Sequence, residues 1–135
     1  MNDDEIRDIL TSVKTIAVVG FSANPARPSN GVAHFLKRKG FRVIPVNPGL
    51  AGRTFLGETV YASLGDIPDP IDMVDVFRAS DHVAAVMEEA IAIKAKVVWT
   101  QLDVVDEAAA AKGRTAGLKV VMDRCPAIEM PRLGL

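Results

Sequence analysis

The feature that most constrains the fold of this 135-residue chain is a regular alternation between short apolar runs and helical patterns. The apolar runs are rich in β-branched residues, as is typical of buried strands, and occupy 15–19, 41–46, 73–77, 96–99 and 118–122, with a weaker run at 59–61. Most of the segments between them carry apolar side chains at helical spacing. Because parallel strands need crossover connections, this alternation predicts a parallel sheet with helices on both faces.

The sequence therefore predicts an α/β fold, a Rossmann-like three-layer α/β/α sandwich with a mainly parallel sheet of five or six strands. The expected strand order runs from an edge at 59–61 through 41–46, 15–19, 73–77 and 96–99, with 118–122 as a sixth edge strand. Strand order then reverses beside the first strand, which is where such sheets bind ligands. The length is usual for one domain and no linker divides it, so we expect residues 1–135 to form a single domain.

Capping residues predict where the helices begin and end. The expected N-caps are Asn2 for the first helix, Ser29 or Asn30 for the second, Ser80 or Asp81 for the third, and Asp103 or Asp106 for an alanine-rich fourth. Gly40 and Gly117 are expected to end the second and fourth helices. The tail, 123–135, is expected to hold a short helical turn.

The amino-acid composition indicates the cellular environment of the protein and which classes of partner to expect. Apolar residues make up 49% of the chain, and 16 basic residues stand against 17 acidic ones, which gives a net charge of −1. This balance does not indicate nucleic acid or a membrane surface as the main partner. The single cysteine, Cys125, excludes an intramolecular disulfide, and the acidic N-terminus lacks the pattern of a signal peptide. We therefore expect a cytoplasmic protein.

The loop after the first strand has the chemistry of an anion site. Gly20 allows a sharp turn and a close approach of the backbone to a ligand. The N-terminal end of the following helix favours an anion, while Ser22 and Ser29 add hydroxyl donors and Arg27 adds a fixed positive charge. The alternative is a surface arginine followed by a simple serine cap. At the position where strand order reverses, we favour a phosphate site.

The sequence departs from known nucleotide-binding fingerprints, and these departures reduce the range of ligands to consider. The dinucleotide pattern G-x-G-x-x-G requires glycine where Ser22 and Pro25 stand. After the second strand, where NAD-binding domains usually carry an acidic residue for the ribose, this chain has Asn47 and Pro48. The P-loop pattern is also absent. These features argue against ordinary NAD binding and against a P-loop nucleotide hydrolase.

Two further loops carry candidate ligand contacts. Phe77 and Arg78 follow the fourth strand and are suited to flanking an adenine or a phosphate. The alternative is that Phe77 belongs to the core and Arg78 to a helix end. Thr100 and Gln101 follow the fifth strand and are suited to hydrogen-bonding a ligand's amide or carbonyl, or they form an ordinary polar loop.

Several segments together resemble the compact, single-domain bacterial CoA-binding proteins. They are VVGFSANPARPS at 18–29, VIPVNP at 43–48, DMVDVFR at 72–78, AKVVWTQ at 95–101 and VMDRCP at 121–126, and the similarity continues through Arg132 and Leu133. More distantly, the chain is similar to the CoA-binding domain of the succinyl-CoA synthetase α subunit, in which a Gly-Phe-Thr-type loop holds the cofactor. The resemblance covers essentially the whole chain in order.

The resemblance implies a Rossmann-like CoA-binding domain with coenzyme A, or an acyl-CoA, as its small-molecule ligand. The binding role that it implies falls on Gly20, Phe21, Ser22, Ala23, Asn24, Pro25, Arg27, Ser29, Asn47, Pro48, Phe77, Arg78, Thr100 and Gln101. The ribose of CoA carries a 3′-phosphate, which an acidic residue after the second strand would repel. CoA thus accounts for the missing NAD features.

Nothing in the sequence forms a recognisable catalytic set. The only histidines, His34 and His82, fall in predicted helical regions, and neither matches the phosphorylated histidine of the synthetase. Cys125 is either a small buried residue or a thiol close enough to the CoA sulfur for a mixed disulfide. Acidic residues stand at 66, 69, 72 and 75, but no histidine cluster accompanies them, so they do not indicate a metal site.

Three functional hypotheses follow. The first is a non-catalytic CoA-binding module that acts as a carrier, a regulator or a partner subunit, with room for a protein partner or a homo-oligomer. The second is the CoA-binding part of an acyl-CoA ligase or acyltransferase whose catalytic part is another chain. The third is an NAD(H)-sensing dinucleotide-binding protein, which would normally need a DNA-binding domain for which no residues remain.

Overall fold

The central element of the fold is a five-stranded parallel sheet. The computed structural model describes residues 1–135. The strands are β1 (Thr15–Val19), β2 (Arg42–Val46), β5 (Met73–Val76), β6 (Val97–Thr100) and β7 (Lys119–Val121). They lie in the order β2-β1-β5-β6-β7, and all four neighbouring pairs are parallel. The α/β fold with a parallel sheet is therefore confirmed.

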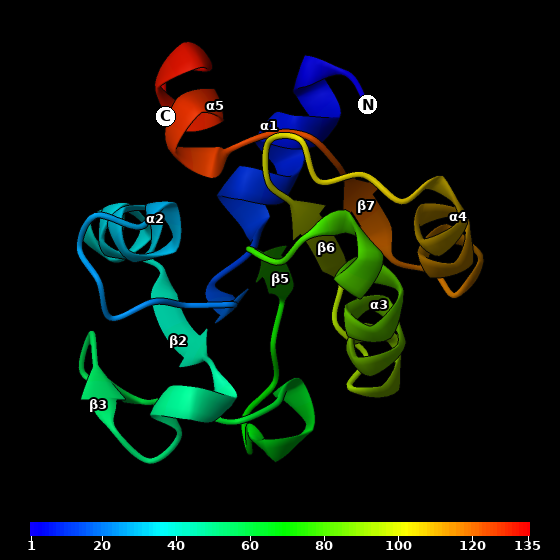
Figure 1. Cartoon of the computed structure of the whole chain (residues 1–135). Coiled ribbons are helices and arrows are strands. Elements are labelled where there is room, and N and C mark those ends of the chain that lie inside the picture. The colour runs from blue at the N-terminus through cyan, green and yellow to red at the C-terminus, as the bar shows by residue number, and fades with distance from the viewer.

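Helices cover both faces of this sheet (Figure 1). One face carries α1 (Asp3–Ser12), α2 (Pro28–Arg38) and α5 (Pro126–Arg132), and the other carries α3 (Val83–Ala92) and α4 (Glu107–Thr115). The strands are buried on both faces, so alternate residues of a strand belong to two different apolar clusters. On β1, Ile16 and Val18 lie in one cluster, and Ala17 and Val19 lie in the other. This double burial explains why the strands read as continuous apolar runs.

The expected edge strand at 59–61 is wrong as a strand of the main sheet. Thr54–Phe55 (β3) and Glu58–Thr59 (β4) form a two-stranded antiparallel hairpin instead. Tyr61 forms a single parallel bridge to Val46 of the main sheet, and Glu58 is joined to Arg42 of β2 by an ion pair. Apart from this reduced edge, the observed order agrees with the expected one, and the run at 118–122 supplies the opposite edge.

The helix ends confirm some caps and correct others. Asn2 Oδ1 accepts a hydrogen bond from Glu5 N at 2.9 Å, and Asp106 Oδ1 accepts from Ala109 N at 3.0 Å, as expected. The predicted cap of α2 is wrong, because this helix begins at Pro28 with Arg27 as its N-cap. A proline at the first helical position, with its φ already fixed, starts the helix earlier than a serine cap would.

The start of α3 also differs from the expectation. A short 3₁₀ turn, Ser80–His82, precedes the helix, and His82 rather than Ser80 or Asp81 is its N-cap. The Ser80 hydroxyl instead accepts a hydrogen bond from Val105 N at 3.0 Å, which ties this turn to the loop after β6. The local capping signal was therefore overridden by a tertiary contact.

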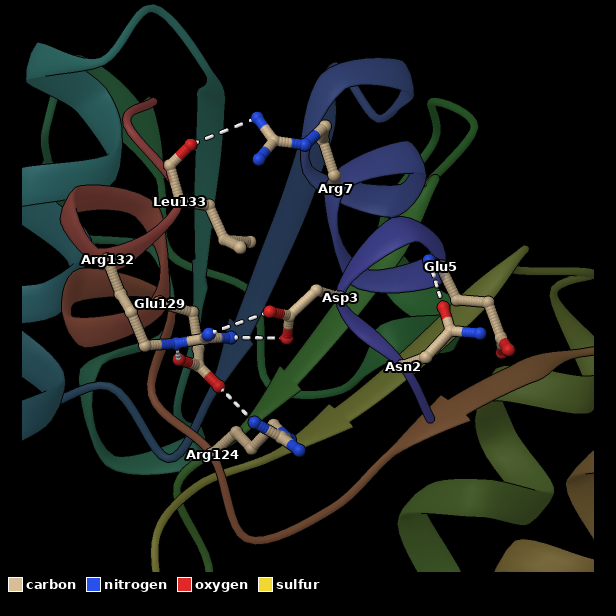
Figure 2. Close-up of polar contacts among 8 residues, drawn as sticks. All are labelled: Asn2, Asp3, Glu5, Arg7, Arg124, Glu129, Arg132 and Leu133. Atoms are coloured by element: carbon tan, nitrogen blue, oxygen red, sulfur yellow. Dashed lines mark hydrogen bonds and ion pairs between the residues drawn. The ribbon is translucent and has the colours of Figure 1, made fainter.

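Polar contacts join the two ends of the chain (Figure 2). The Arg132 guanidinium donates to both carboxylate oxygens of Asp3, at 3.1 and 2.9 Å, and to Glu129 Oε2 at 2.7 Å. Arg124 pairs with the other oxygen of Glu129, and Arg7 donates to the Leu133 carbonyl at 3.0 Å. These contacts fasten α5 to α1 and so fix the segment between β7 and α5.

None of the helices has the length and apolar character needed to cross a lipid bilayer.

Candidate ligand-binding site

The candidate site is a pocket of about 600 Å³ formed by loops that follow the carboxyl ends of β1, β2, β5, β6 and β7. β1 lies between β2 and β5. The chain therefore passes from β1 to its neighbour β2 toward one edge of the sheet, and later returns to β5 on the other side of β1. Ligands of open parallel sheets bind at this reversal. The pocket is lined by Gly20, Phe21, Ser22, Arg27, Pro28, Ser29, Val32, Asn47, Phe77, Arg78, Ala79, Gln101, Leu102, Val104 and Cys125.

Gly20 forms the turn that opens the pocket. Its φ is +87°, a left-handed conformation that side chains disfavour. A Cβ at this position would lie 2.5 Å from the carbonyl oxygen of Phe77. The Gly20 N–H donates to Val46 O at 3.0 Å, so the loop is fixed to the neighbouring strand from the outset. The position accepts only glycine because the backbones after β1 and β5 meet there.

The first loop is held by its own polar side chains. Ser29 Oγ accepts from Ser22 N at 2.9 Å, and Asn30 Nδ2 donates to Ser22 O at 2.9 Å. Asn24 Oδ1 accepts from Ala26 N at 3.0 Å in a short side-chain turn. Ser29 is therefore not the helix cap expected from sequence but a buried residue in the first turn of α2 that positions the loop.

Asn47 fastens the first loop to the second. Its Nδ2 donates to Phe21 O at 2.7 Å, and its Oδ1 accepts from Gly49 N at 2.8 Å. Both polar ends of this side chain thus bind backbone, although the residue also lines the pocket. Pro48 begins the following 3₁₀ turn, Pro48–Leu50, and does not line the pocket.

The charged residues around the pocket are all cations. Arg27 is exposed and makes no ion pair. Arg78 makes no ion pair either, and its only polar side-chain contact is with the ring of His82, with Nη2 at 3.3 Å from Nδ1. The first turn of α2 adds Pro28 and Ser29 to the wall, and a helix N-terminus favours an anion. No aspartate or glutamate lines the pocket. The arrangement therefore favours a ligand with negative charge.

The two phenylalanines differ in their placement. Phe21 is fully buried, and its ring packs against Phe55 with centroids 5.4 Å apart. It therefore contributes mainly to the core beneath the pocket. Phe77 is half-buried, lines the pocket and also packs on the core cluster, so its position is compatible with a contact to a ligand and with a core role.

Thr100 and Gln101, the polar residues at the end of β6, also differ in their placement. The Thr100 hydroxyl is buried, donates to Val104 O at 2.6 Å and accepts from Asp123 N at 3.3 Å, so it serves the fold rather than the pocket wall. Gln101 lines the pocket, and its Nε2 donates to Asp75 Oδ1 at 2.5 Å. The two neighbours in sequence thus have separate roles.

Asp75 is the residue that sequence reasoning missed. It lies on β5, completely buried, and its Oδ2 has no hydrogen-bond partner. Burial in an apolar environment raises the pKa of Asp75 to about 7, although the hydrogen bond from Gln101 acts in the opposite direction. One signal was present in the sequence: an acidic residue in the middle of the apolar run Met73–Val76 needs a buried partner.

Cys125 also belongs to the pocket wall. It is half-buried at the N-cap of α5. Burial raises the pKa of its thiol, with hydrogen bonds from the backbone of α5 opposing the shift and the charges of Asp75 and Glu129 adding to it. A raised pKa favours the thiol over the nucleophilic thiolate, so the surroundings do not activate this cysteine.

Nine of the fourteen residues singled out from sequence line this single pocket, namely Gly20, Phe21, Ser22, Arg27, Ser29, Asn47, Phe77, Arg78 and Gln101. The other five, which lie outside its wall, are Ala23, Asn24, Pro25, Pro48 and Thr100. Six lining residues were not in the set, namely Pro28, Val32, Ala79, Leu102, Val104 and Cys125. Most of these six are apolar, and their residue types give no chemical signal in a sequence.

The fold and the pocket define an open parallel α/β protein that has a pocket lined by two arginines and no carboxylate where the strand order reverses. The chain belongs to the CoA binding domain family, whose model matches residues 14–131. The matched range contains all five strands of the sheet and every residue that lines the pocket.

Three similar proteins illustrate this relationship. The uncharacterized protein YneT of Bacillus subtilis is 40% identical over 121 residues, which cover 90% of this chain and 88% of YneT. A solved structure from Thermus thermophilus, cell-free ID.343, is 39% identical with a TM-score of 0.94, covering 98% of this chain and 99% of that one. The ADP-forming acetate–CoA ligase II of Archaeoglobus fulgidus is 33% identical over 87 residues, 63% of this chain but 12% of the ligase.

Proposed function

We propose that this protein binds coenzyme A, or an acyl-CoA, in the pocket at the carboxyl end of the sheet and acts as a non-catalytic binding, carrier or regulatory module. The observation that carries the proposal is a pocket lined by two arginines and no carboxylate, in a chain of the CoA binding domain family. CoA is a polyanion, with a diphosphate and a 3′-phosphate. Arginines without carboxylate partners are suited to such a ligand.

The positions of the arginines support this assignment. Arg27 precedes α2 on the first loop, and Arg78 follows β5 on the third, so the two cations come from opposite sides of the strand-order reversal. A ligand with more than one phosphate group is able to use both. No acidic residue lines the pocket, so the usual partner of an NAD ribose hydroxyl is missing. For the same reason, no carboxylate of the pocket wall repels the 3′-phosphate of CoA.

Calorimetric titration of three arginine variants tests the proposal. Loss of one charge-assisted hydrogen bond to a phosphate is worth roughly tenfold in Kd or more, and we expect R27A and R78A each to weaken CoA binding by about that factor. Arg38, at the exposed end of α2 and without an ion pair, is the matched control, and R38A should bind CoA like the wild type. Equal affinity of R27A, R78A and R38A would contradict a phosphate role for the pocket arginines.

A second candidate function is that of the CoA-binding part of an acyl-CoA ligase whose catalytic part is another chain. The similarity to a short part of an acetate–CoA ligase favours it. Incubation of the purified chain with acetate, ATP and CoA tests whether this chain catalyses acyl-CoA formation by itself. Neither candidate predicts acyl-CoA from this chain alone, so turnover by the chain alone would contradict both.

A further inference from the structure

A buried carboxylate lies behind the wall of the pocket, and the proposed function leaves it without a role. Asp75 is on β5, between Val18 of β1 and Trp99 of β6 in the sheet register. Its carboxyl group is completely buried, and Oδ2 has no partner. Its one hydrogen bond is the contact of 2.5 Å from Gln101 Nε2 to Oδ1. A buried charge with a single partner is costly to the fold, which suggests that this contact has a function.

The contact determines which end of Gln101 faces the pocket. Gln101 lines the pocket, and its Oε1 accepts no hydrogen bond from the protein. An ionised carboxylate only accepts hydrogen bonds, so it binds the amide NH₂ and leaves the amide oxygen for a ligand. We propose that Asp75 is a positioning residue that holds Gln101 as a hydrogen-bond acceptor of the site, so that the pocket selects ligands with an N–H or O–H donor at this point.

The proposal rests on the proposed function and makes it more specific. CoA offers such donors in two parts of the molecule, namely the adenine nucleotide, through its exocyclic amine and ribose 2′-hydroxyl, and the pantetheine arm, through its amide and hydroxyl groups. The shared requirement is a donor directed at Gln101 Oε1. 3′,5′-ADP carries only the adenine part, so a comparison of CoA with 3′,5′-ADP shows which part supplies the donor.

The surroundings of Asp75 allow its charge to change near neutral pH. On this face of the sheet α1 and α2 contribute apolar residues to the core. The titratable groups on the side of α5 are Cys125 and Glu129, and Glu129 is held ionised by Arg124 and Arg132. Because the pKa of Asp75 is raised to about 7, the carboxyl becomes neutral in mildly acidic solution. A neutral carboxyl accepts from the amide NH₂ through its carbonyl oxygen or donates to the amide oxygen through its O–H, so Gln101 then loses its fixed orientation.

The test uses three variants and calorimetric titration with CoA. Gln101→Met keeps the length of the side chain without the acceptor and should weaken binding about fivefold to tenfold, as expected for one lost hydrogen bond. Asp75→Leu leaves Gln101 without its partner and should weaken binding about twofold to fivefold, because only part of the population presents Oε1. Asp75→Asn carries both a donor and an acceptor, like the neutral carboxyl, so it does not fix the orientation of Gln101 and should weaken binding about twofold to fivefold at pH 8.

A readout independent of affinity is the side-chain amide signal of Gln101 in ¹H–¹⁵N NMR spectra of the ligand-free protein. It should shift with a midpoint near the pKa of Asp75, about 7, in the wild type and stay constant in Asp75→Asn. CoA affinity should likewise fall below this pH in the wild type relative to Asp75→Asn. All other titratable groups of the protein and the ligand are common to both proteins, so the difference between the two profiles reports Asp75.

The outcomes separate this inference from the proposed function. If the wild type does not bind CoA, the proposed function fails. If the wild type binds CoA but Gln101→Met and Asp75→Leu bind it equally well, and the Gln101 signal does not titrate, the positioning role fails while the CoA site stands. If Asp75→Leu does not fold, Asp75→Asn and the NMR titration decide the question.

Discussion

At the scale of single residues, Gly20 is the position where the fold and the candidate site depend most directly on each other. Its left-handed φ and the nearby carbonyl of Phe77 leave no room for a Cβ. The same turn sends the chain from β1 to α2 and places Phe21 and Ser22 at the pocket. A substitution at this residue therefore disturbs the loops after β1 and β5 together.

Replacing Gly20 with alanine separates this close contact from backbone strain. We expect G20A to lower the free energy of unfolding by at least about 2 kcal/mol, since a left-handed conformation costs about 1 kcal/mol and the clash with backbone adds to it. Gly40 has a φ of +99° with open space around its Cα, so G40A should lose only the strain contribution. Urea denaturation measures both variants, and equal losses would contradict the close-contact argument.

The buried carboxyl group of Asp75 should make the stability of the folded state depend on pH. Its folded-state pKa of about 7 lies above the ordinary value of 3.8, so the neutral form favours the folded state. The contribution is fully present below about pH 4 and is lost as the pH rises through 7, with a total on the order of 4 kcal/mol. The stability of Asp75→Asn relative to the wild type should therefore rise between pH 4 and 7. A pH-independent difference in urea denaturation would show that Asp75 does not titrate in this range.

At the scale of elements, side chains that bind backbone hold the loops of the site together. Asn47 spans the first two loops through Phe21 O and Gly49 N. Arginine and serine residues in this region suggested ligand contacts from sequence. The structure shows that Ser29 and Asn47 hold the backbone of the loops around the pocket. A sequence does not distinguish these two roles, because the same polar atoms serve both.

Asn47→Ala tests this organising role. We expect it to lower the free energy of unfolding by about 1–2 kcal/mol and to weaken CoA binding, because the Phe21 carbonyl loses its partner and the first loop loosens. Asn24→Ala, which removes only an exposed side-chain turn, is the control and should cost less than about 0.5 kcal/mol. Urea denaturation of both variants gives the stability comparison, and calorimetric titration of Asn47→Ala with CoA measures the effect on binding. Wild-type stability of Asn47→Ala would remove the organising role.

The docking of α5 depends on Glu129. This residue is buried between Arg124 and Arg132 (Figure 2). Burial alone would raise the pKa of Glu129, but the hydrogen bonds from Arg132 and Arg124 lower it below its usual value. The stabilising contribution of this carboxylate is therefore present above about pH 4.5 and is lost as the pH falls through the lowered pKa.

We expect Glu129→Ala to cost about 2 kcal/mol at pH 7, less than a fully buried pair because both arginines are partly exposed. The cost should shrink in acid, below the lowered pKa of Glu129, where the wild-type carboxyl is protonated. Glu89→Ala on α3, where the glutamate has no ion pair, is the control and should change stability little at either pH. A loss that does not depend on pH would argue for packing rather than for the ion pairs.

At the scale of the whole molecule, the sheet and the location of the pocket were predictable from sequence. The apolar runs at 15–19 and 73–77 are long enough to show double burial, and the crossover rule then fixes where the strand order reverses. The run at 59–61 was too short to reveal that Tyr61 forms only one bridge. Leu102 and Val104 were not predictable as pocket residues, since their place depends on how the loop after β6 folds back.

The measurement that tests the central claim most directly is a calorimetric titration of the wild-type protein with CoA, dephospho-CoA, acetyl-CoA and NAD. We predict that CoA and acetyl-CoA bind at one site per chain, and that loss of the 3′-phosphate weakens binding by roughly tenfold, as one charge-assisted contact would. NAD should bind far more weakly than CoA. Tight binding of NAD together with no binding of CoA would contradict the account.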